Sequence, residues 1–308
     1  MTLQQLEYIV AVDKYSSFVQ ASDSCGVTQS TLSTMIQKLE NELDVVIFDR
    51  NSRPIRTTMI GEQIVNQAKT VLFNVRQLDE MVKSEQKLCE GEIKMSFCPT
   101  IAPYITPKLF KYLKDRYPKV TIRACEMSRD EIIEKLCRTE IDMAVMSCPQ
   151  KNDQLLEIPL YREQFLAYVS PMSPLYKEKN IDMQTMPRER LWGLKDEISL
   201  QYQVEEICDL DLEHSSVYEA GNIPTLMMIV DSNGGYTAIP ELHINLLREE
   251  YREHIRPFVN PVPYRNVSLF VRNDYVRERI LNIMAEAIIH IIPRHMLDEH
   301  LLKYKIHL

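Results

Sequence analysis

Apolar residues in the first 60 positions recur at intervals typical of short amphipathic helices. One helix is predicted near the N-terminus. A second, over residues 18–25, ends before Gly26, which can take the positive φ of a sharp turn. Thr28 is placed to cap a third helix over residues 29–43. One face of this third helix is apolar and is expected to be buried: Leu32, Ile36, Leu39 and Leu43. The pattern is that of a helix-turn-helix.

The exposed face at the start of the third helix is polar. Besides the cap Thr28, it carries mostly short hydrogen-bonding side chains: Gln29, Ser30, Thr31, Ser33, Thr34 and, further on, the basic Lys38. Such groups suit base edges and phosphates when a helix end enters a major groove, although any amphipathic helix can begin with a polar turn. Residues 49–58 favour the first interpretation, because they hold a proline and three arginines, Arg50, Arg53 and Arg56, as a wing against phosphates requires. We therefore predict a winged helix-turn-helix over residues 1–58 that binds double-stranded DNA.

A regular repeat of apolar residues follows in the linker over residues 59–90. The repeat has spacings of 4, 3, 4, 3 and 4 and contains no proline: Ile64, Ala68, Val71, Val75, Leu78 and Val82. A helix packed on its own domain is one explanation. A period of 3.5 residues favours a partner helix of equal length, so we expect a dimerising linker and a homodimer or homotetramer. Dimerisation would hold two DNA-reading heads at a fixed separation.

From residue 91 the pattern changes to strands that alternate with helices. Strands predicted over 93–98, 120–126 and 141–146 alternate with helices over 101–116 and 128–138, which implies a parallel sheet with right-handed crossovers. A second half follows with strands over 165–170, 217–220, 236–239 and 267–271, and a last helix over 275–292. The expected fold class is α/β, with a regulatory domain over residues 91–308.

Ligands of such sheets bind beyond the carboxyl ends of the strands. Thr100 and Ser128 begin predicted helices there, where free N–H groups suit an anion, and Arg129 could add a charged contact. Ser147 follows the third strand. The alternative is that Ser128 only caps its helix and that Arg129 is solvated. The pattern therefore predicts a small-molecule effector site at these strand ends.

Charge and composition limit the function further. The net charge of −8 over 308 residues argues by itself against a nucleic-acid binder, and residues 1–58 contain five basic and seven acidic side chains, so only their arrangement supports DNA binding. No apolar run reaches the ~20 residues of a membrane helix, and the N-terminus lacks the features of a secretory signal, so we expect a cytoplasmic protein without membrane association. Seven scattered cysteines without a CxxC indicate neither a zinc site nor a disulfide framework.

No motif in the chain indicates catalysis. We find no phosphate-binding glycine loop, nucleophile elbow or set of metal ligands, so we expect no cofactor and no enzymatic activity, and an α/β enzyme is the least supported alternative. A periplasmic solute-binding protein is disfavoured by the N-terminal head and the missing signal.

The N-terminal residues resemble the signature of LysR-type transcription regulators. The matching residues occur in the family's order: Phe18, Ala21, Val27, Thr28, Gln29, Ser30, Thr31, Leu32, Ser33, Ile36, Leu39, Glu40, Glu42, Leu43, Phe48, Arg50, Thr58 and Gly61. Asp44 stands where glycine is usual and Ile60 where alanine is usual, and we interpret both as turn or packing variations.

This resemblance implies a dimerising linker and a periplasmic-binding-protein-like effector domain of two α/β subdomains. Subdomain I would comprise residues 91–161 and 267–308, and subdomain II residues 162–266. Thr100, Ser128 and Ser147 match positions that line the effector cleft of the family. RNA polymerase is a candidate partner.

Within the family, the chain is similar to the OxyR peroxide sensors over essentially its whole length. That branch carries a peroxide-reactive cysteine in a Gly-His-Cys-Leu-Arg-Asp-Gln motif, and a resolving cysteine follows nine residues later. Here Ser199 stands at the reactive position, Tyr202 replaces the aspartate, and Cys208 remains at the resolving position. Since serine cannot form the thiolate that attacks peroxide, we expect this sensing chemistry to be lost.

We therefore expect a small effector in the cleft between the subdomains, with Ser199, Tyr202 and Asn222 joining the residues named above. The alternative is a redox response through other cysteines, for which the candidates are Cys208, Cys98, Cys125 and Cys148. Cysteines on strands are more often small buried apolar residues.

Overall fold

The computed structural model describes residues 1–85, 91–147, 152–187, 191–194, 217–218 and 222–297. Contacts between residues divide the chain into two compact units, the first formed mainly by residues 1–88 and the second by most of the chain from residue 89 on. The α/β class predicted from the sequence is confirmed, because a helical first unit is followed by a unit in which helices pack on a sheet.

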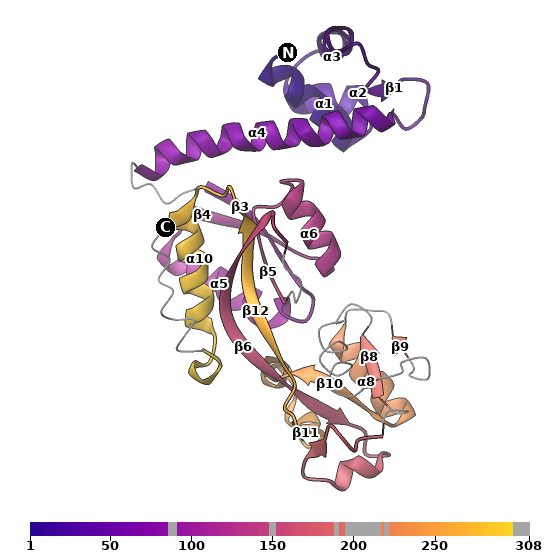
Figure 1. Ribbon diagram of the computed structural model, residues 1–308, viewed down its shortest axis with the longest axis vertical. Coiled ribbons are helices and arrows are strands. Elements are labelled where there is room, and N and C mark those ends of the chain that lie inside the picture. Colours follow the sequence, from indigo (N-terminus) through magenta and orange to yellow (C-terminus); the bar gives the residue numbers. More distant parts are fainter. Residues whose placement is uncertain (86–90, 148–151, 188–190, 195–216, 219–221, 298–308) are drawn as a thin grey trace. The chain divides into compact units, whose positions relative to one another are not determined.

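The first unit is a three-helix head with a short hairpin and a long helix. Its elements are α1 Leu3–Tyr15, α2 Phe18–Cys25, α3 Gln29–Leu43, β1 Phe48–Asp49, β2 Arg56–Thr57 and α4 Met59–Glu85 (Figure 1). The side chains of Thr2, Ser17 and Thr28 each accept a hydrogen bond from a first-turn amide, so all three short helices begin at a capping residue. Apolar side chains of the four helices form one core, in which Ile9, Leu32 and Ile36 are fully buried.

The end of α3 differs from the sequence prediction. Leu43 was expected on the buried face, but it is 38% exposed. The reason is that the helix ends there, since Asp44 takes a left-handed conformation with φ 53° and its amide closes the last turn on Glu40. Asp44 therefore performs the C-cap role that glycine fills more easily.

Replacing Asp44 with glycine should stabilise the first unit by about 0.5–1 kcal/mol, because glycine adopts positive φ without a Cβ clash and the substitution removes a negative charge from a helix C-terminus. Urea unfolding of the full-length protein measures this gain. Asp44→Ala also removes the charge but keeps the Cβ, so it is the control that isolates the contribution of the positive φ. A glycine variant no more stable than the alanine variant would contradict the interpretation.

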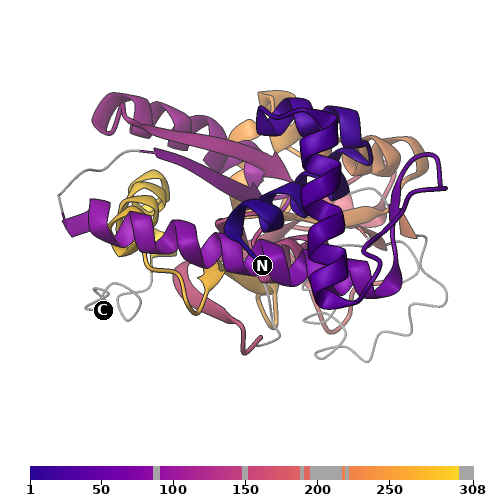
Figure 2. The same cartoon turned by 90° about the horizontal axis from the view of Figure 1, so that it is seen from above.

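The helix α4 runs without interruption over Met59–Glu85 (Figure 2). The first half of its apolar repeat packs within the first unit, since Ala68 is buried and Ile64 and Val71 lie against the core. Leu78, further along the repeat, is 63% exposed. The alternative of packing on its own domain thus explains the first half of the repeat, and Leu78 is accessible to a partner helix.

The strands of the second unit join in one sheet. Their order is β4-β3-β5-β12-β6-β10-β8-β9, with β11 beside β6 and β7 beside β11. The bounds are β3 Gly91–Phe97, β4 Val120–Glu126, β5 Met143–Met146, β6 Leu155–Val169, β7 Ile181–Asp182, β8 Leu191–Leu194, β9 Val217–Tyr218, β10 Tyr236–Pro240, β11 Ile255–Val259 and β12 Tyr264–Arg272. The predicted parallel arrangement of the first three strands is confirmed, because β3 pairs in parallel with both β4 and β5.

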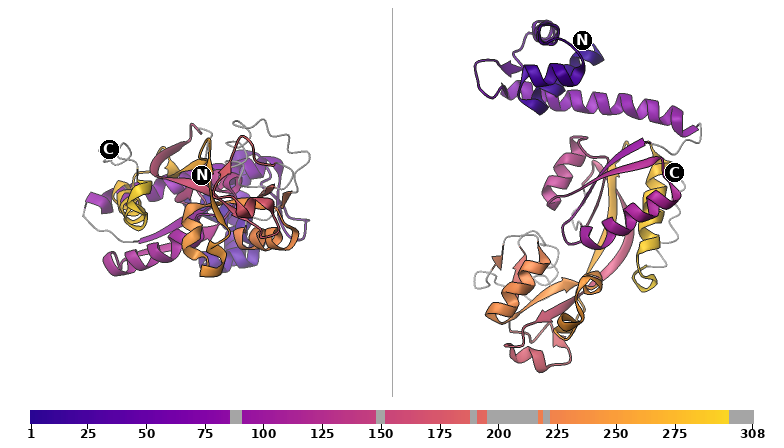
Figure 3. Two further views of the ribbon diagram at one scale, coloured as in Figure 1. Left: turned by 90° about the horizontal axis from the view of Figure 1, so that it is seen from below. Right: turned by 180° about the vertical axis from the view of Figure 1, so that it is seen from behind.

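Helices cover this sheet on both faces. They are α5 Ala102–Arg116, α6 Arg129–Cys137, α8 Ile223–Asn233, α9 Glu249–Arg252 and α10 Glu278–Ile291, with 3-10 turns η1 Pro174–Lys177, η4 Glu241–Leu246 and η5 Arg294–Met296. In the first half of the unit (β3, β4, β5, α5, α6 and α10), α5 and α10 lie side by side and α6 lies on the other face (Figures 1 and 3). The second half contains β7 to β11, α8, α9 and η4. Among the described helices, none combines the length and the apolar character needed to cross a membrane.

The strands β6 and β12 run side by side between the two halves (Figure 1). Both are longer than the strands predicted over 165–170 and 267–271. The prediction missed the first part of β6 because Pro159 and the polar residues 162–164 interrupt its apolar pattern. The prediction also missed β11, in which Arg256 and Pro257 obscure the alternation.

Candidate functional site

The first turn of α3 forms a polar patch on the surface of the first unit. Thr28, Gln29, Ser30, Thr31 and Thr34 are exposed, as is Lys38, whereas Ser33 is half-buried. The Thr28 hydroxyl accepts a hydrogen bond from the Thr31 amide at 3.2 Å and contacts the hydroxyls of Ser30 and Thr31 at 3.0 and 2.8 Å. The patch can therefore offer hydrogen bonds to an external partner from a helix end fixed by its cap.

Arg50 has a different environment from the other two wing arginines. Its guanidinium donates to the Glu40 carboxylate at 2.9 Å and to the Ser33 hydroxyl at 3.2 Å, and it lies over the Phe18 ring. The sequence assigned Arg50 only to phosphate contacts. Because Glu40 is buried and also accepts from the amides of Ile47 and Phe48, Arg50 holds the start of the hairpin against α3.

Arg53 and Arg56 lie in or beside the hairpin connection between β1 and β2 and are exposed. Within the described part of the chain, neither forms an ion pair. Two of the seven acids of this region are paired with cations outside the five counted bases, since Glu42 binds the N-terminal ammonium and Asp13 binds Lys69. The unfavourable count of charges therefore overstates the negative charge near the polar patch.

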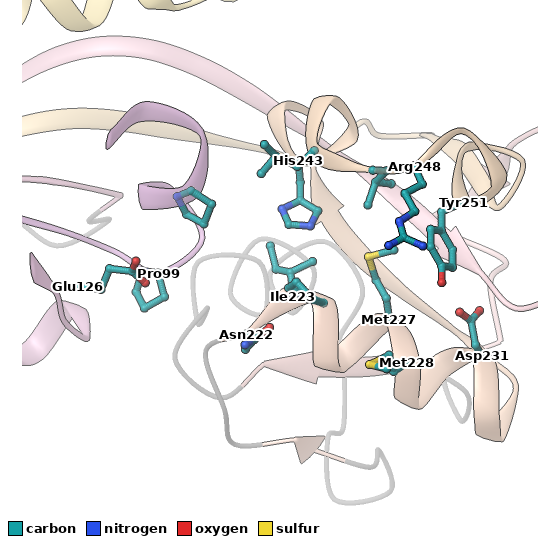
Figure 4. A pocket seen from close by; sticks show the side chains of 14 residues that line it. Pro99, Glu126, Asn222, Ile223, Met227, Met228, Asp231, His243, Arg248 and Tyr251 are labelled. Atoms are coloured by element: carbon teal, nitrogen blue, oxygen red, sulfur yellow. The ribbon is translucent and has the colours of Figure 1, made fainter. Parts of the chain in front are cut away.

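A cavity of about 540 Å³ lies in the second unit and is lined by both of its halves (Figure 4). Pro99, Pro103 and Glu126 come from the first half. The second half supplies Asn222, Ile223, Pro224, Met227, Met228, Asp231, His243, Leu246, Leu247, Arg248 and Tyr251. The lining is mostly apolar with a few polar groups, as is typical of small-molecule sites.

The sequence predicted only part of this lining. Asn222 borders the cavity and also caps α8 by accepting from the Thr225 amide. Ser128 accepts from the Glu131 amide at the start of α6, and Arg129 lies 3.7 Å from Asp130. These two residues and Ser147 are not among the residues that line the cavity, and their role in effector binding stays a prediction.

Four further candidates, Ser199, Tyr202, Cys148 and Cys208, lie outside the described residues. Several lining residues were missed because η4 and α9 carry no apolar periodicity that would have predicted them. Their signal in the sequence is limited to the apolar and basic run over residues 246–248.

Thr100 is buried in a network of charged groups. Arg265 donates to the Thr100 hydroxyl at 2.8 Å and forms an ion pair with Glu163 at 2.8 Å, and the side chains of Arg265 and Glu163 are 2% and 0% exposed. The other Glu163 oxygen accepts from the Leu242 amide at 2.8 Å. The Thr100 hydroxyl is thus engaged by Arg265, and the role of Thr100 in effector binding stays a prediction.

His243 lies at the border between this network and the cavity. It is only 6% exposed. Burial lowers the pKa of His243 to about 4, and the positive charge of Arg265 acts in the same direction. The His243 imidazole is therefore a neutral part of the cavity lining at physiological pH.

The second unit should lose stability as the pH falls from 6.5 towards 4. In this range the unfolded chain binds a proton at His243 and the folded chain does not, so the contribution is complete above pH 6.5 and decreases below it. At pH 5 the loss amounts to about 2 kcal/mol. Urea unfolding at pH 7 and pH 5 measures it, with His243→Gln as the comparison. Equal losses in the wild type and the variant would contradict the assignment.

A second polar group in the cavity wall is Asp231. Both of its carboxylate oxygens accept from the Tyr168 hydroxyl, at 3.0 and 2.8 Å, and His254 lies 3.4 Å away. Burial raises the pKa of Tyr168, and the Asp231 carboxylate raises it further. The Asp231 carboxylate is thus engaged by Tyr168 and His254 of the same unit.

The described cysteines do not form disulfides. Of these, Cys125 is exposed, whereas Cys25, Cys98 and Cys137 are half-buried. The pKa of Cys137 is raised by burial, which opposes thiolate formation.

Comparison with known families gives two matches that together cover most of the chain. Residues 3–62 match the bacterial regulatory helix-turn-helix of the lysR family, and residues 87–299 match the LysR substrate binding domain. These ranges correspond to the head that contains α3 and to the unit that contains the cavity.

Similar proteins of known name are regulators. The hydrogen peroxide-inducible genes activator of Haemophilus influenzae is 31% identical over 94% of this chain and 97% of its own, and the dual regulator OxyR of Escherichia coli is 29% identical over 94% and 95%. A full-length OxyR variant from Pseudomonas aeruginosa has a similar structure, with a TM-score of 0.77, 28% identity and coverage of 94% of both chains. The OxyR structure from Porphyromonas gingivalis aligns with a TM-score of 0.63 and 31% identity over 68% of this chain and 96% of its own.

Proposed function

Because the chain belongs to the LysR family of transcription regulators and is similar to OxyR, we propose that the first turn of α3 contacts DNA and that the cavity of the second unit binds a small effector. The observation that carries the proposal is the exposed polar patch at the start of α3, in the same unit as the exposed Arg53 and Arg56. In this proposal Gln29, Ser30, Thr31 and Thr34 reach base edges or phosphates, and the two arginines contact the backbone.

Leu78, exposed on α4, supports pairing of two linker helices, so that a dimer or tetramer presents two heads to DNA. We further propose that the protein acts in the cytoplasm without enzymatic activity, and that RNA polymerase is its partner on DNA.

Replacing Arg53 with alanine should weaken binding to all DNA duplexes alike. A phosphate contact carries no sequence information, and its loss should reduce the slope of log affinity against log salt concentration by about one for each head. Fluorescence anisotropy with labelled duplexes over a series of salt concentrations measures both effects. Arg123→Ala, which removes an exposed arginine of the second unit, is the matched control. An unchanged slope in the Arg53 variant would refute its role.

The signal is proposed to be an effector in the cavity and not peroxide at position 199. Several relatives, among them the Haemophilus influenzae protein, are named as activators of hydrogen peroxide-inducible genes, but Ser199 has no thiol to oxidise. Thiol labelling and DNA affinity, both measured before and after peroxide, test this point. We expect unchanged DNA affinity. A change in affinity together with the loss of a free thiol at Cys98, Cys125, Cys148 or Cys208 would favour the redox alternative.

A further inference from the structure

The buried network around Arg265 lies where the sheet passes from one half of the second unit to the other. The strand β6 pairs with β12 up to Gln164 and with β10 from Phe165 on. Glu163 and Arg265 are direct cross-strand partners one position before this change. Their ion pair therefore occupies the point at which β6 leaves the first half and enters the second.

The ion pair has one arm in each half. On the first side, Arg265 donates to the hydroxyl of Thr100, which lies two residues before the start of α5, at 2.8 Å. On the second side, Glu163 accepts from the amide of Leu242 in η4 at 2.8 Å. We call these four residues, Thr100, Glu163, Leu242 and Arg265, the crossover clamp.

Both arms end next to residues that line the cavity. Pro99 precedes Thr100, and His243 follows Leu242. Figure 4 shows Pro99 and His243 on opposing walls. A ligand that fills the cavity and presses on these walls would therefore displace both arms of the clamp.

The charged groups of the clamp are buried, which makes partial separation of the ion pair unfavourable. Its two charged side chains are almost fully buried, so separating one partner leaves a charge without compensation and is strongly unfavourable. The Tyr161 hydroxyl is also buried, has no hydrogen-bond partner among the described residues, and is near enough for the charges of Glu163 and Arg265 to act on it. The Tyr161 hydroxyl could therefore hydrogen-bond to Glu163 or Arg265 in a second arrangement of the clamp. Elements with two discrete arrangements are the ones that can transmit a signal.

We propose that the crossover clamp couples occupancy of the cavity to the relative position of the two halves, with Thr100 and Glu163 as positioning residues. This inference rests on the proposed function and adds the route by which an effector acts. In this proposal Thr100 acts through its hydrogen bond to Arg265, which connects the first half to the second.

Hydrogen exchange of the Leu242 amide, measured by mass spectrometry on the full-length protein, reports on the clamp directly. Thr100→Val keeps the shape and removes the hydroxyl, and it should accelerate exchange at Leu242, in the other half, at least about tenfold. Thr100→Ser keeps the hydroxyl and should stay near the wild-type rate. Ser268→Ala, which removes a partly buried hydrogen bond from β12 to Glu157 of β6, is the control that touches neither arm. Equal exchange rates of the Leu242 amide in Thr100→Val and Thr100→Ser would contradict the proposal that Thr100 acts on Leu242 through the clamp.

The coupling between the cavity and the clamp is tested with variants of Met228, a lining residue outside the clamp. Met228 lines the cavity and is 67% exposed, so Met228→Trp should partly fill the cavity and accelerate exchange at Leu242, whereas Met228→Leu should not. If Thr100→Val fails to fold, Thr100→Ala replaces it. An unchanged exchange rate of the Leu242 amide in Met228→Trp would contradict coupling between the cavity and the clamp. DNA affinity is measured in parallel, because a wild-type protein that does not bind DNA would refute the proposed function but not the clamp.

Discussion

Replacing Glu163 with alanine should destabilise the second unit by about 3–5 kcal/mol, because it leaves the buried guanidinium of Arg265 without its counter-charge. The Leu242 amide loses its acceptor in the same step. Breaking a buried pair from one side is costly even where the intact pair adds little net stability, since the remaining charge cannot reach water. The unfolding free energy of the full-length protein, from urea titration monitored by circular dichroism, measures the loss.

Three variants separate this explanation from a general effect of truncation. Glu163→Gln keeps the hydrogen-bonding shape without the charge and should cost less than alanine. The double variant Glu163→Met with Arg265→Met removes both charges and should recover part of the loss. Glu157→Ala removes another β6 carboxylate, which accepts a hydrogen bond from Ser268 and lies outside the clamp. A double variant that is less stable than Glu163→Ala would contradict the explanation.

Replacing Gly61 with alanine should destabilise the first unit by at least about 3 kcal/mol. A Cβ at this position would lie 2.0 Å from the backbone oxygen of Ile47, and backbone cannot move aside as the end of a side chain can. The contact holds the start of α4 against the hairpin, where Thr58 donates its amide to the same Ile47 oxygen at 2.9 Å. DNA binding should be lost together with the fold of the head.

The matched control for Gly61→Ala is Gly193→Ala, because a Cβ at Gly193 meets nothing within 4 Å. Thermal unfolding should show a large decrease in Tm for the first variant and almost none for the second. A Gly61→Ala protein with a wild-type Tm would show that the first turn of α4 can move away from Ile47.

The sequence predicted the elements whose apolar period is uninterrupted. The helix that contains Leu32 and Ile36 and the three parallel strands of the first half follow the predicted pattern closely. It failed where polar residues are buried, as in β6, because an ion pair with a residue 102 positions away compensates Glu163 and no local pattern reveals that partner. Leu43 was misplaced for a related reason, since the end of α3 depends on the left-handed Asp44.

The candidate sites were predicted unevenly. The polar patch of α3 is local, so its cap and its exposed side chains could be predicted from neighbouring residues alone. The cavity is assembled from segments far apart in the sequence, and of its described lining only Asn222 was predicted. Thr100 was identified as important by its place before a helix, but its environment depends on Arg265, 165 positions away.

Selection of DNA from a random duplex library by the full-length protein tests directly whether the first turn of α3 reads base sequence. We expect enrichment of one sequence with two symmetric half-sites, each recognised by one head, and a weaker base preference within each half-site when Gln29 is replaced by alanine. Recovery of no common sequence by the wild-type protein, or an identical preference in the Gln29→Ala variant, would contradict the assignment of the first turn of α3 as the DNA-reading element.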